Sequence, residues 1–349
     1  MIGGILLFTT VIASIFVFGV LIFVHELGHF MTAKWVGMRV DEFALGFGKK
    51  LISFRRGETL YSLRLIPLGG FNKIAGMDPD EEQDERSFGA KPIWARILVI
   101  VAGSAMNFLL PVLLFLIVFL SAGIDNVSDQ PIIGNIFADK PAARAGLMTG
   151  DRIVSVNNEK IDSWRQFVTL VQNSGQKPLH IQFDRAGTTG QAEVVPEFDN
   201  KANRGIIGVM PQIDNYRPGF FESVKLSVVQ TYTVTAAMIT GLLQMVTGQV
   251  AAEVAGPIGV AQMAGEVAQL GIIPLLQFAA FLSLNLGLLN LLPVPVLDGG
   301  HVVALALEGV RGKSLSRDKM QFLQMIGFAL LLLLTLVATF KDIAKLKLF

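Results

Sequence analysis

The stretch that decides the fold is Ile2–His29, IGGILLFTTVIASIFVFGVLIFVHELGH, an apolar run that ends in two histidines and a glutamate. Its apolar part, residues 2–24, has about the 20 residues that a helix needs to cross a bilayer. It lacks the basic leader of a cleavable signal peptide. A helix driven only by burial would avoid three ionisable side chains at its end. The bland interpretation is a polar helix end whose side chains reach the membrane surface; the alternative is a reactive site.

The polar end of this run fits the pattern H-E-x-x-H at positions 25–29. Side chains four residues apart lie on one face of a helix, so His25 and His29 can bind a single Zn²⁺. Glu26 stands beside them, where it can take a proton from a water molecule on the metal. The pattern therefore predicts a zinc site at the inner end of the first apolar run.

A third zinc ligand has to come from another part of the chain, because a catalytic zinc commonly takes three protein ligands and leaves one position open. The chain has no cysteine and only four histidines, so the choice is narrow. Asp298 is the favoured ligand because it precedes Gly299 and Gly300, which let the backbone approach closely. His301 is the competing ligand, and His180 is predicted to be an ordinary strand residue.

The composition is that of a membrane protein, with 52% hydrophobic and 16% charged residues, where soluble proteins have about 25% charged. A fifth apolar stretch, Leu226–Val250, carries scattered polar residues and is predicted to lie on the membrane or against the bundle. The formal net charge of +1 gives no reason to expect a nucleic-acid partner. The runs long enough to span are residues 2–24, Ile97–Ile124, Pro274–Leu292 and Phe322–Phe340.

Basic residues set the expected orientation. Lys and Arg are concentrated in Lys34–Arg96 and in Arg311–Lys319, so both segments are expected in the cytoplasm and the N-terminus outside. Three C-terminal lysines argue the other way: Lys341, Lys345 and Lys347. If Leu226–Val250 crossed the membrane, Asp298 would end at the opposite face from His25. A shared metal therefore favours four spans.

Two segments outside the spans have strand character. Leu60–Ile66 and Gly70–Ile74 predict a β-hairpin around Pro67-Leu68-Gly69, close behind the metal helix. Residues 128–215 predict a separate extracytoplasmic α+β domain, which divides the chain into 1–127, 128–215 and 216–349. Its expected elements are strands at Ile132–Ile136, Arg152–Val156, Leu179–Phe183 and Ala192–Val195, and a helix at Ser163–Gln172.

HELGH at residues 25–29 and NLLPVPVLDGGH at Asn290–His301 together resemble the site-2 protease family, the intramembrane zinc metalloproteases of regulated intramembrane proteolysis. Bacterial members join the two motifs through extracytoplasmic PDZ domains, and GLMTGDRI at Gly146–Ile153 is similar to a turn of those domains. GPIG at Gly256–Gly259 is similar to a further family segment. The resemblance implies an α-helical integral membrane protein with about four transmembrane helices. It also implies a cytoplasmic-side membrane-associated β-hairpin and an inserted extracytoplasmic α+β PDZ domain.

The resemblance also assigns roles by motif position. It implies that Glu26 is the general base and that Asn290 and Pro293 hold the substrate segment extended. The implied zinc ligands are His25, His29 and Asp298.

The sequence departs from the family pattern in three places, none of which is expected to touch the metal site. Phe71-Asn72-Lys73 stands in the implied substrate-docking strand where relatives often have Tyr-Val-Lys. Ser104 replaces a frequent proline in the second span. Only one PDZ domain is evident, where well-known relatives carry two.

The implied activity is that of a zinc-dependent intramembrane endopeptidase in the bacterial cytoplasmic membrane. Its substrates would be single-span membrane proteins, such as anti-sigma factors or signal-peptide remnants, cut in their transmembrane segments after a prior site-1 cleavage. A size gate is favoured for the PDZ domain over binding of a new C-terminus.

Two other functions stay open. A metal or proton transporter also places His and Asp within the membrane, although four spans without an inverted repeat argue against it. A catalytically inactive PDZ scaffold is the second, and the intact Glu26 argues against it, because a structural site needs no base.

Overall fold

The computed structural model describes residues 2–77, 81, 83–199, 204–250, 255–313 and 316–345. The chain divides into two units. The first, here called the membrane unit, consists of Met1–Ser121 and Gly219–Phe349, and the second, the inserted unit, consists of Ala122–Pro218. Each is described by itself.

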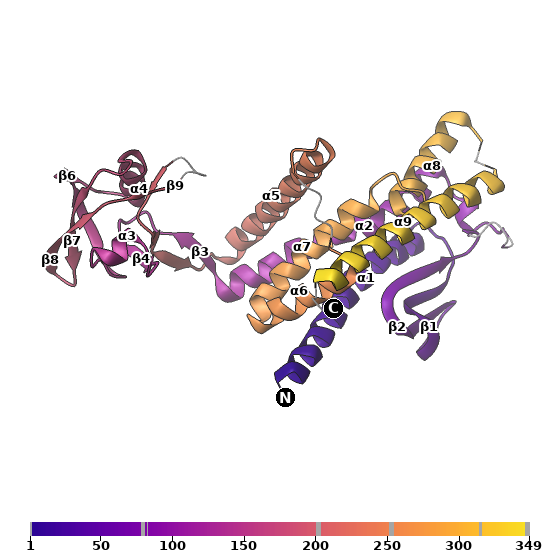
Figure 1. Cartoon of the computed structure of the whole chain (residues 1–349). Helices are drawn as coiled ribbons and strands as arrows, with labels where there is room; N and C mark the ends of the chain where they lie inside the picture. Colours follow the sequence, from indigo (N-terminus) through magenta and orange to yellow (C-terminus); the bar gives the residue numbers. More distant parts are fainter. Residues whose placement is uncertain are drawn as a thin grey trace. The chain divides into compact units, whose positions relative to one another are not determined.

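The membrane unit is built from long apolar helices and one β-hairpin (Figure 1). Its helices are α1 (Ile2–Trp35), α2 (Ile93–Ala122), α5 (Phe220–Val246), α6 (Pro257–Gln269), α7 (Ile272–Asn290), α8 (Asp298–Arg311) and α9 (Arg317–Lys345). The hairpin strands are β1 (Val40–Arg56) and β2 (Thr59–Ile74), and a 3-10 turn follows at Phe88–Ala90.

Five of these helices are long and apolar enough to cross a membrane, judged by length and composition within the described residues. Four of them, α1, α2, α7 and α9, cover the four predicted spans. The fifth is α5, the helix expected to lie on the membrane, so the predicted count of four rests on whether α5 crosses. The sequence did not predict α6 or α8.

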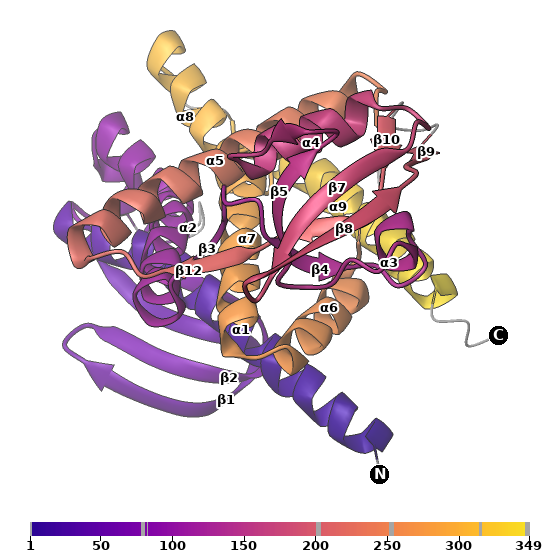
Figure 2. The same cartoon turned by 90° about the vertical axis from the view of Figure 1, so that its left-hand side faces the viewer.

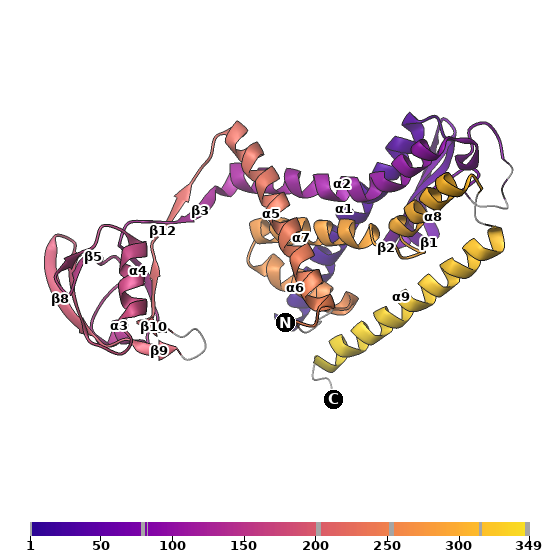
Figure 3. The same ribbon diagram turned by 90° about the horizontal axis from the view of Figure 1, so that it is seen from above.

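The helix α6 lies beside the half of α1 that is remote from the HELGH motif (Figure 3). Ser14 donates a hydrogen bond to the Ala261 carbonyl over 3.3 Å. A Cβ on Gly265 would stand 2.0 Å from the Thr10 hydroxyl oxygen, so only glycine permits this approach of α6 to α1. The start of α6 is held by α9, because the Asp342 carboxylate accepts hydrogen bonds from the backbone of Gly256 and Gly259.

The hairpin reverses at a different place from the predicted one. The reversal lies at Gly57, whose φ of +62° suits a turn, and β2 runs on through residues 67–69. These residues mark a close approach instead, because a Cβ on Gly69 would stand 2.2 Å from the Phe47 ring. Residues 42–45 of β1 therefore pair with both 60–63 and 70–73 of β2.

The hairpin turn is tied to the end of α1 by charge. Glu58 forms an ion pair with Lys34, in the last turn of α1, and a bidentate pair with Arg86 at 2.7 and 2.8 Å. Hydrogen bonds from Arg86 and Lys34 lower the pKa of the Glu58 carboxyl to about 2. The curled hairpin thus stays beside the helix that carries the HELGH motif (Figure 2).

The inserted unit is an α+β fold around a four-stranded sheet in the order β6-β5-β7-β8. The predicted helix and four predicted strands are confirmed, and Ser163 caps α4 by accepting a hydrogen bond from the Gln166 backbone. The apolar core is centred on Phe167, Ile153 and Ile181, each about 1% exposed. The elements are β3 (Ile124–Val127), β4 (Ile133–Ile136), α3 (Pro141–Arg144), β5 (Arg152–Val156), β6 (Glu159–Lys160), α4 (Trp164–Asn173), β7 (Leu179–Arg185), β8 (Thr188–Val194), β9 (Glu197–Asp199), β10 (Arg204–Ile206), β11 (Val209–Pro211) and β12 (Ile213–Tyr216).

Candidate metal centre

Two histidines of α1 and the first residue of α8 bring three metal-ligating atoms together. The Nε2 atoms of His25 and His29 are 3.1 Å apart. Asp298 Oδ2 lies 3.5 Å from the first and 3.6 Å from the second. A tetrahedral zinc with ligand bonds of about 2.0–2.1 Å separates neighbouring ligand atoms by about 3.3 Å. The three residues therefore fit a zinc ion without rearrangement.

The far side of each imidazole is also engaged. His29 Nδ1 donates a hydrogen bond to the Val99 carbonyl over 2.8 Å, which leaves the lone pair of Nε2 for a metal. The Asn107 amide lies 3.1 Å from His25 Nδ1. When His25 binds metal through Nε2, its proton is on Nδ1, and Asn107 Oδ1 can accept it after a half-turn of the amide. Both contacts come from α2, which thereby orients the ligands.

Glycines give the imidazoles their room. A Cβ on Gly103 of α2 would stand 2.2 Å from His29 Nε2, so any side chain there would enter the ligand set. A Cβ on Gly28 would stand 2.4 Å from the Ala102 carbonyl, which means that α1 and α2 pack backbone against backbone. The close packing of α1 and α2 beside the two histidines therefore requires glycine at positions 28 and 103.

The start of α8 is fitted against the end of α7 in the same manner. A Cβ on Gly299 would stand 2.3 Å from the carbonyl oxygens of Leu291 and Leu292, and one on Gly300 would stand 2.2 Å from the Val294 carbonyl oxygen. The close approach expected from the double glycine is therefore present, and it sets Asp298 at the first position of the helix.

Two contacts to α2, neither of them predicted, hold α8 in place. Arg96 forms a bidentate pair with Glu308, with its Nη2 2.6 Å and its Nη1 3.3 Å from the carboxylate oxygens. Ser104 Oγ donates a hydrogen bond over 3.3 Å to Asp298 Oδ2, the oxygen that faces the histidines. Ser104 was noted in the sequence only as a departure from the family pattern, and the expectation that it does not touch the metal site was wrong.

Glu26 is held by the hairpin. Asn72 of β2 donates from Nδ2 to Glu26 Oε2 over 2.7 Å and to the Glu26 carbonyl over 2.8 Å. A Cβ on Gly70 would stand 2.8 Å from Glu26 Cγ, so β2 lies directly against this side chain. The hairpin is therefore part of the surroundings of the proposed base.

The remaining predicted residues divide into near and distant ones. Asn290 ends α7, with its Nδ2 3.5 Å from His25 Nε2. Phe71 stacks on Phe47, with ring centroids 6.4 Å apart, and Lys73 pairs with Glu81 over 2.9 Å. Neither Phe71 nor Lys73, nor the exposed Pro293, is among the described side chains that meet at the metal ligands.

The competing ligand His301 and the remaining histidine, His180, both lie outside the ligand cluster found among the described residues. His301 follows Asp298 by three residues on α8. His180 is exposed on β7, and its backbone N–H donates to Asn157 Oδ1.

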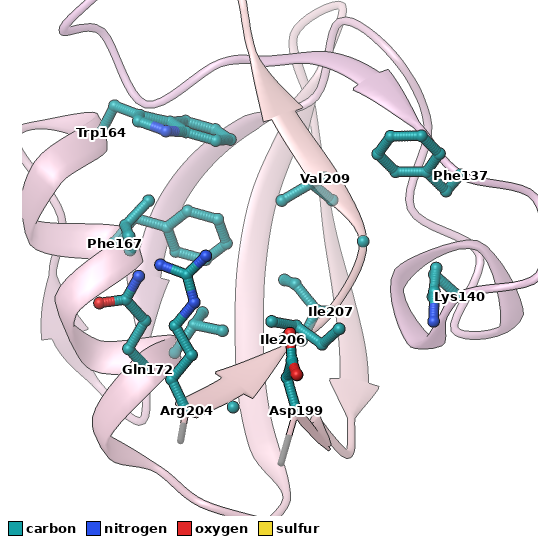
Figure 4. Close-up of a pocket in the computed structure, with 14 residues that line it drawn as sticks. Phe137, Lys140, Trp164, Phe167, Gln172, Asp199, Arg204, Ile206, Ile207 and Val209 are labelled. Carbon is teal, nitrogen blue, oxygen red and sulfur yellow. The ribbon is translucent and has the colours of Figure 1, made fainter. Parts of the chain in front are cut away.

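The inserted unit has a pocket of its own, of about 500 Å³ (Figure 4). One wall is the apolar face of α4, with Trp164, Phe167 and Val171, and the other is formed by β10 and β11. Lys140 and Arg204 also line it. Its size and apolar walls suit an extended peptide.

The whole chain resembles known proteins. The sequence profile of peptidase family M50 matches residues 13–334. The chain is 35% identical to the regulator of sigma-W protease RasP of Bacillus subtilis, over 97% of this chain and 99% of that one. It is 37% identical to a putative zinc metalloprotease of Clostridium acetobutylicum, over 96% and 98%.

Among solved structures, some match about a quarter of the chain. The crystal structure of the PDZ domain of an SdrC-like protein from Listeria monocytogenes is 22% identical, with a TM-score of 0.21, over 25% of this chain and 90% of that one. The family match, by contrast, runs through both units and contains every residue of the metal centre. The resemblance to site-2 proteases is thus confirmed: the chain belongs to peptidase family M50 and is a zinc metalloendopeptidase with membrane-spanning helices.

Proposed function

We propose that this zinc metalloendopeptidase cuts the transmembrane segments of single-span membrane proteins, with His25, His29 and Asp298 as the zinc ligands and Glu26 as the general base. The observation that carries the proposal is the approach of three ligand atoms to within 3.1–3.6 Å of one another. Two of these atoms belong to a helix long and apolar enough to cross a membrane. Substrates inside the bilayer are the ones such a site can reach.

The chemistry divides between the metal and the chain. Zinc bound there supplies Lewis acidity, which acidifies water and polarises the scissile carbonyl. Glu26 accepts the proton of the attacking water and passes it to the leaving nitrogen. Val99 and Asn107 keep the two imidazoles turned towards the metal, and Ser104 and Arg96 keep the Asp298 carboxylate in reach of it.

A transmembrane substrate must be unwound before it is cut, because its carbonyls are hydrogen-bonded within the helix. Residues 70–74 of β2 support a route for this. Among the described pairings they have a partner strand, residues 40–45, on one side only. A substrate strand added on the other side satisfies the backbone groups that unwinding releases. Because Asn72 contacts Glu26, this edge lies next to the base.

The contacts of α5 and its neighbours support four spans with α5 at the membrane surface. Gly103 of α2 lies beside His29, and Ala122 follows it by about five helical turns, so α2 ends far from the metal. The segment that leads into α5 pairs with residues directly after α2. After α5, the start of α6 is held by Asp342, and α6 lies beside the metal-remote half of α1. Both flanks of α5 thus lie on the side remote from the metal, which supports a helix at the membrane surface over a spanning one.

We further propose that the metal faces the cytoplasm, that the inserted unit is extracytoplasmic and that the membrane is the bacterial cytoplasmic membrane. The basic residues of the hairpin segment and of the α8–α9 loop support this orientation. The name of the Bacillus subtilis relative, regulator of sigma-W protease RasP, supports a role in regulated intramembrane proteolysis. Anti-sigma factors and signal-peptide remnants, trimmed first by a site-1 protease, are the proposed substrates.

For the inserted unit we propose a size gate, which excludes substrates with bulky outer domains. The apolar pocket of Figure 4 favours a second role, the binding of a peptide end exposed by the first cleavage. The two roles differ in what happens to substrates that are already trimmed. A gate is indifferent to them, whereas a recruiting domain is needed to cut them.

The test of the proposed function uses the purified full chain in lipid nanodiscs with a panel of trimmed single-span proteins. Cleavage within the transmembrane segment is expected, together with one zinc ion per chain. Removal of zinc by a chelator should stop cleavage, and re-addition should restore it. A chain that binds zinc and moves metal or protons across vesicles without cutting any of the panel would establish the transporter instead. A chain that binds zinc, transports nothing and cuts nothing would be the inactive scaffold.

A further inference from the structure

One half of the Asn72 amide is hydrogen-bonded, and the other half is buried without a described partner. Its Nδ2 donates both of its protons to Glu26, one to Oε2 over 2.7 Å and one to the main-chain carbonyl over 2.8 Å. A main-chain carbonyl can only accept, so the amide nitrogen must face Glu26. The orientation of the amide is therefore fixed by chemistry, and Oδ1 faces elsewhere.

The other half of the amide, Oδ1, is an acceptor that receives no hydrogen bond from the described residues. Asn72 Oδ1 is buried and has no hydrogen-bond partner among them. A buried carbonyl oxygen without a donor is unfavourable, so such an atom in a native protein calls for a partner, such as a bound group or an ordered water molecule. The donor has to come from outside the described chain.

We infer that Asn72 is a positioning residue that joins the substrate to the general base: Nδ2 holds Glu26, while Oδ1 accepts a backbone N–H of the substrate strand docked beside residues 70–74. This inference rests on the proposed function, in which Glu26 is the base and β2 is the docking edge. An added strand brings backbone N–H donors to this edge. One planar amide then sets the distance between the substrate backbone and the carboxylate that takes the water proton.

Two substitutions separate the halves of the amide. Asn72→Asp keeps an acceptor for the substrate but sets a carboxylate against Glu26. Asn72→Leu keeps the approximate shape but loses the hydrogen bonds of both halves, those from Nδ2 to Glu26 and the proposed one from the substrate to Oδ1. In the active enzyme, Asn72→Leu should lower kcat/KM about 10-fold, and Asn72→Asp should lower it about 100-fold, because two carboxylates repel each other beside the metal centre.

Substrate binding is measured separately in the Glu26→Gln background, in nanodiscs, with a fluorescent single-span peptide that the unmodified enzyme cuts. The amide introduced at position 26 can pair with either Asn or Asp at position 72. Here Asn72→Asp should leave affinity within about 2-fold, whereas Asn72→Leu should weaken it about 3- to 10-fold. Asn72→Asp is thus expected to be the more damaging substitution in the activity measurement, and Asn72→Leu the more damaging one in the binding measurement.

Zinc content and thermal unfolding are recorded for every variant. Ser53→Val, an exposed change on β1 of the same hairpin, is the control for general damage. A side chain with a purely structural role would rank the two substitutions alike in both measurements, and that result would overturn the inference. Unchanged affinity in Asn72→Leu would show that a water molecule, and not substrate, satisfies Oδ1. Full activity of Glu26→Gln alone would instead contradict the proposed function. The failure of the inference and the failure of the proposed function can therefore be told apart.

Discussion

The membrane unit and the inserted unit both bury apolar side chains, but they differ in the apolar side chains that they expose and in the polar ones that they bury. In the inserted unit Phe167 and Ile181 are about 1% exposed, and Asp151 is the charged residue buried among its described side chains. In the membrane unit Phe340 is 72% exposed, while Ser104 and Asn107 are fully buried beside the metal ligands. A bilayer solvates the apolar exterior of the membrane unit and leaves the interior for polar groups. The difference places the buried polar groups of the candidate metal centre in the membrane unit, which leaves control of access as the proposed role of the inserted unit.

The largest effect should come from the base. Glu26→Gln removes the proton acceptor while both adjacent zinc ligands stay, so kcat should fall about 10²- to 10⁴-fold with zinc content unchanged. Cleavage of a single-span substrate and metal analysis on the same preparation test this. Near-normal cleavage by this variant would show that Glu26 is not the general base and that another residue takes the proton.

The next effect concerns the third ligand. Asp298→Asn should weaken zinc binding at least about 100-fold, because the carboxylate lies 3.5 and 3.6 Å from the histidine nitrogens. His301→Asn, on the same helix but outside the ligand cluster, is the matched control and should weaken it less than about 10-fold. Zinc affinity is measured by competition with a chelator on folded protein. The reverse order would give the role to His301.

Removal of the inserted unit should change which substrates are cut. The β3–β12 ladder brings Ile124 and Tyr216 together, so residues 128–212 can be replaced by a short Gly-Ser linker. Substrates with bulky outer domains should then be cut about 10-fold faster or more, and trimmed ones at a rate within about 2-fold.

The same deletion with Glu26→Gln serves as the negative control. Loss of cutting of trimmed substrates, in a folded and zinc-loaded deletion variant, would refute the gate. The pocket of Figure 4 would then be a recruitment site.

The smallest effect on catalysis should come from the core of the inserted unit. Asp151 is fully buried and accepts hydrogen bonds from Arg185 at 2.7 and 2.8 Å and from the Met148 backbone. Asp151→Asn should lower the free energy of local unfolding by about 1–3 kcal/mol. Hydrogen exchange of peptides from β5 and β7 in the full chain measures this.

Asp162→Asn, an exposed residue paired with Lys160, should change that free energy by less than about 0.5 kcal/mol. Cleavage of trimmed substrates should be the same in both variants. A loss of that cleavage in Asp151→Asn would mean that the two units are coupled in catalysis.

The sequence predicted the parts of the site that depend on local geometry. His25 and His29 are four residues apart on a helix, and that spacing alone brings their side chains together. The four apolar runs and the strands of the inserted unit follow from periodicity of the same local kind. Asp298 could be proposed from its glycines, but its approach to the histidines depends on contacts between helices far apart in the chain.

The remaining features follow from packing that no local pattern reports. The hairpin was predicted to reverse at Pro67-Leu68-Gly69, but the chain reverses at Gly57. The predicted turn lies within β2, whose two halves pair with opposite sides of the same part of β1. The contacts of Ser104 and Asn107 join α2 to residues on two other helices. Polar side chains in an apolar run identify a candidate site, but only the fold reveals the partner of each.

The wide separation of the metal ligands along the chain has a consequence for biosynthesis. A nascent chain presents His25 and His29 early, but the helix that begins with Asp298 is made only when most of the protein has been translated. Until then the two imidazoles lack their third ligand, and no zinc can close the long loop between α1 and α8. With these three residues as its zinc ligands, the protease would be inert during its own insertion and would become competent only once α8 has joined the bundle. Copies that terminate before Asp298 should accordingly bind zinc poorly and cut nothing.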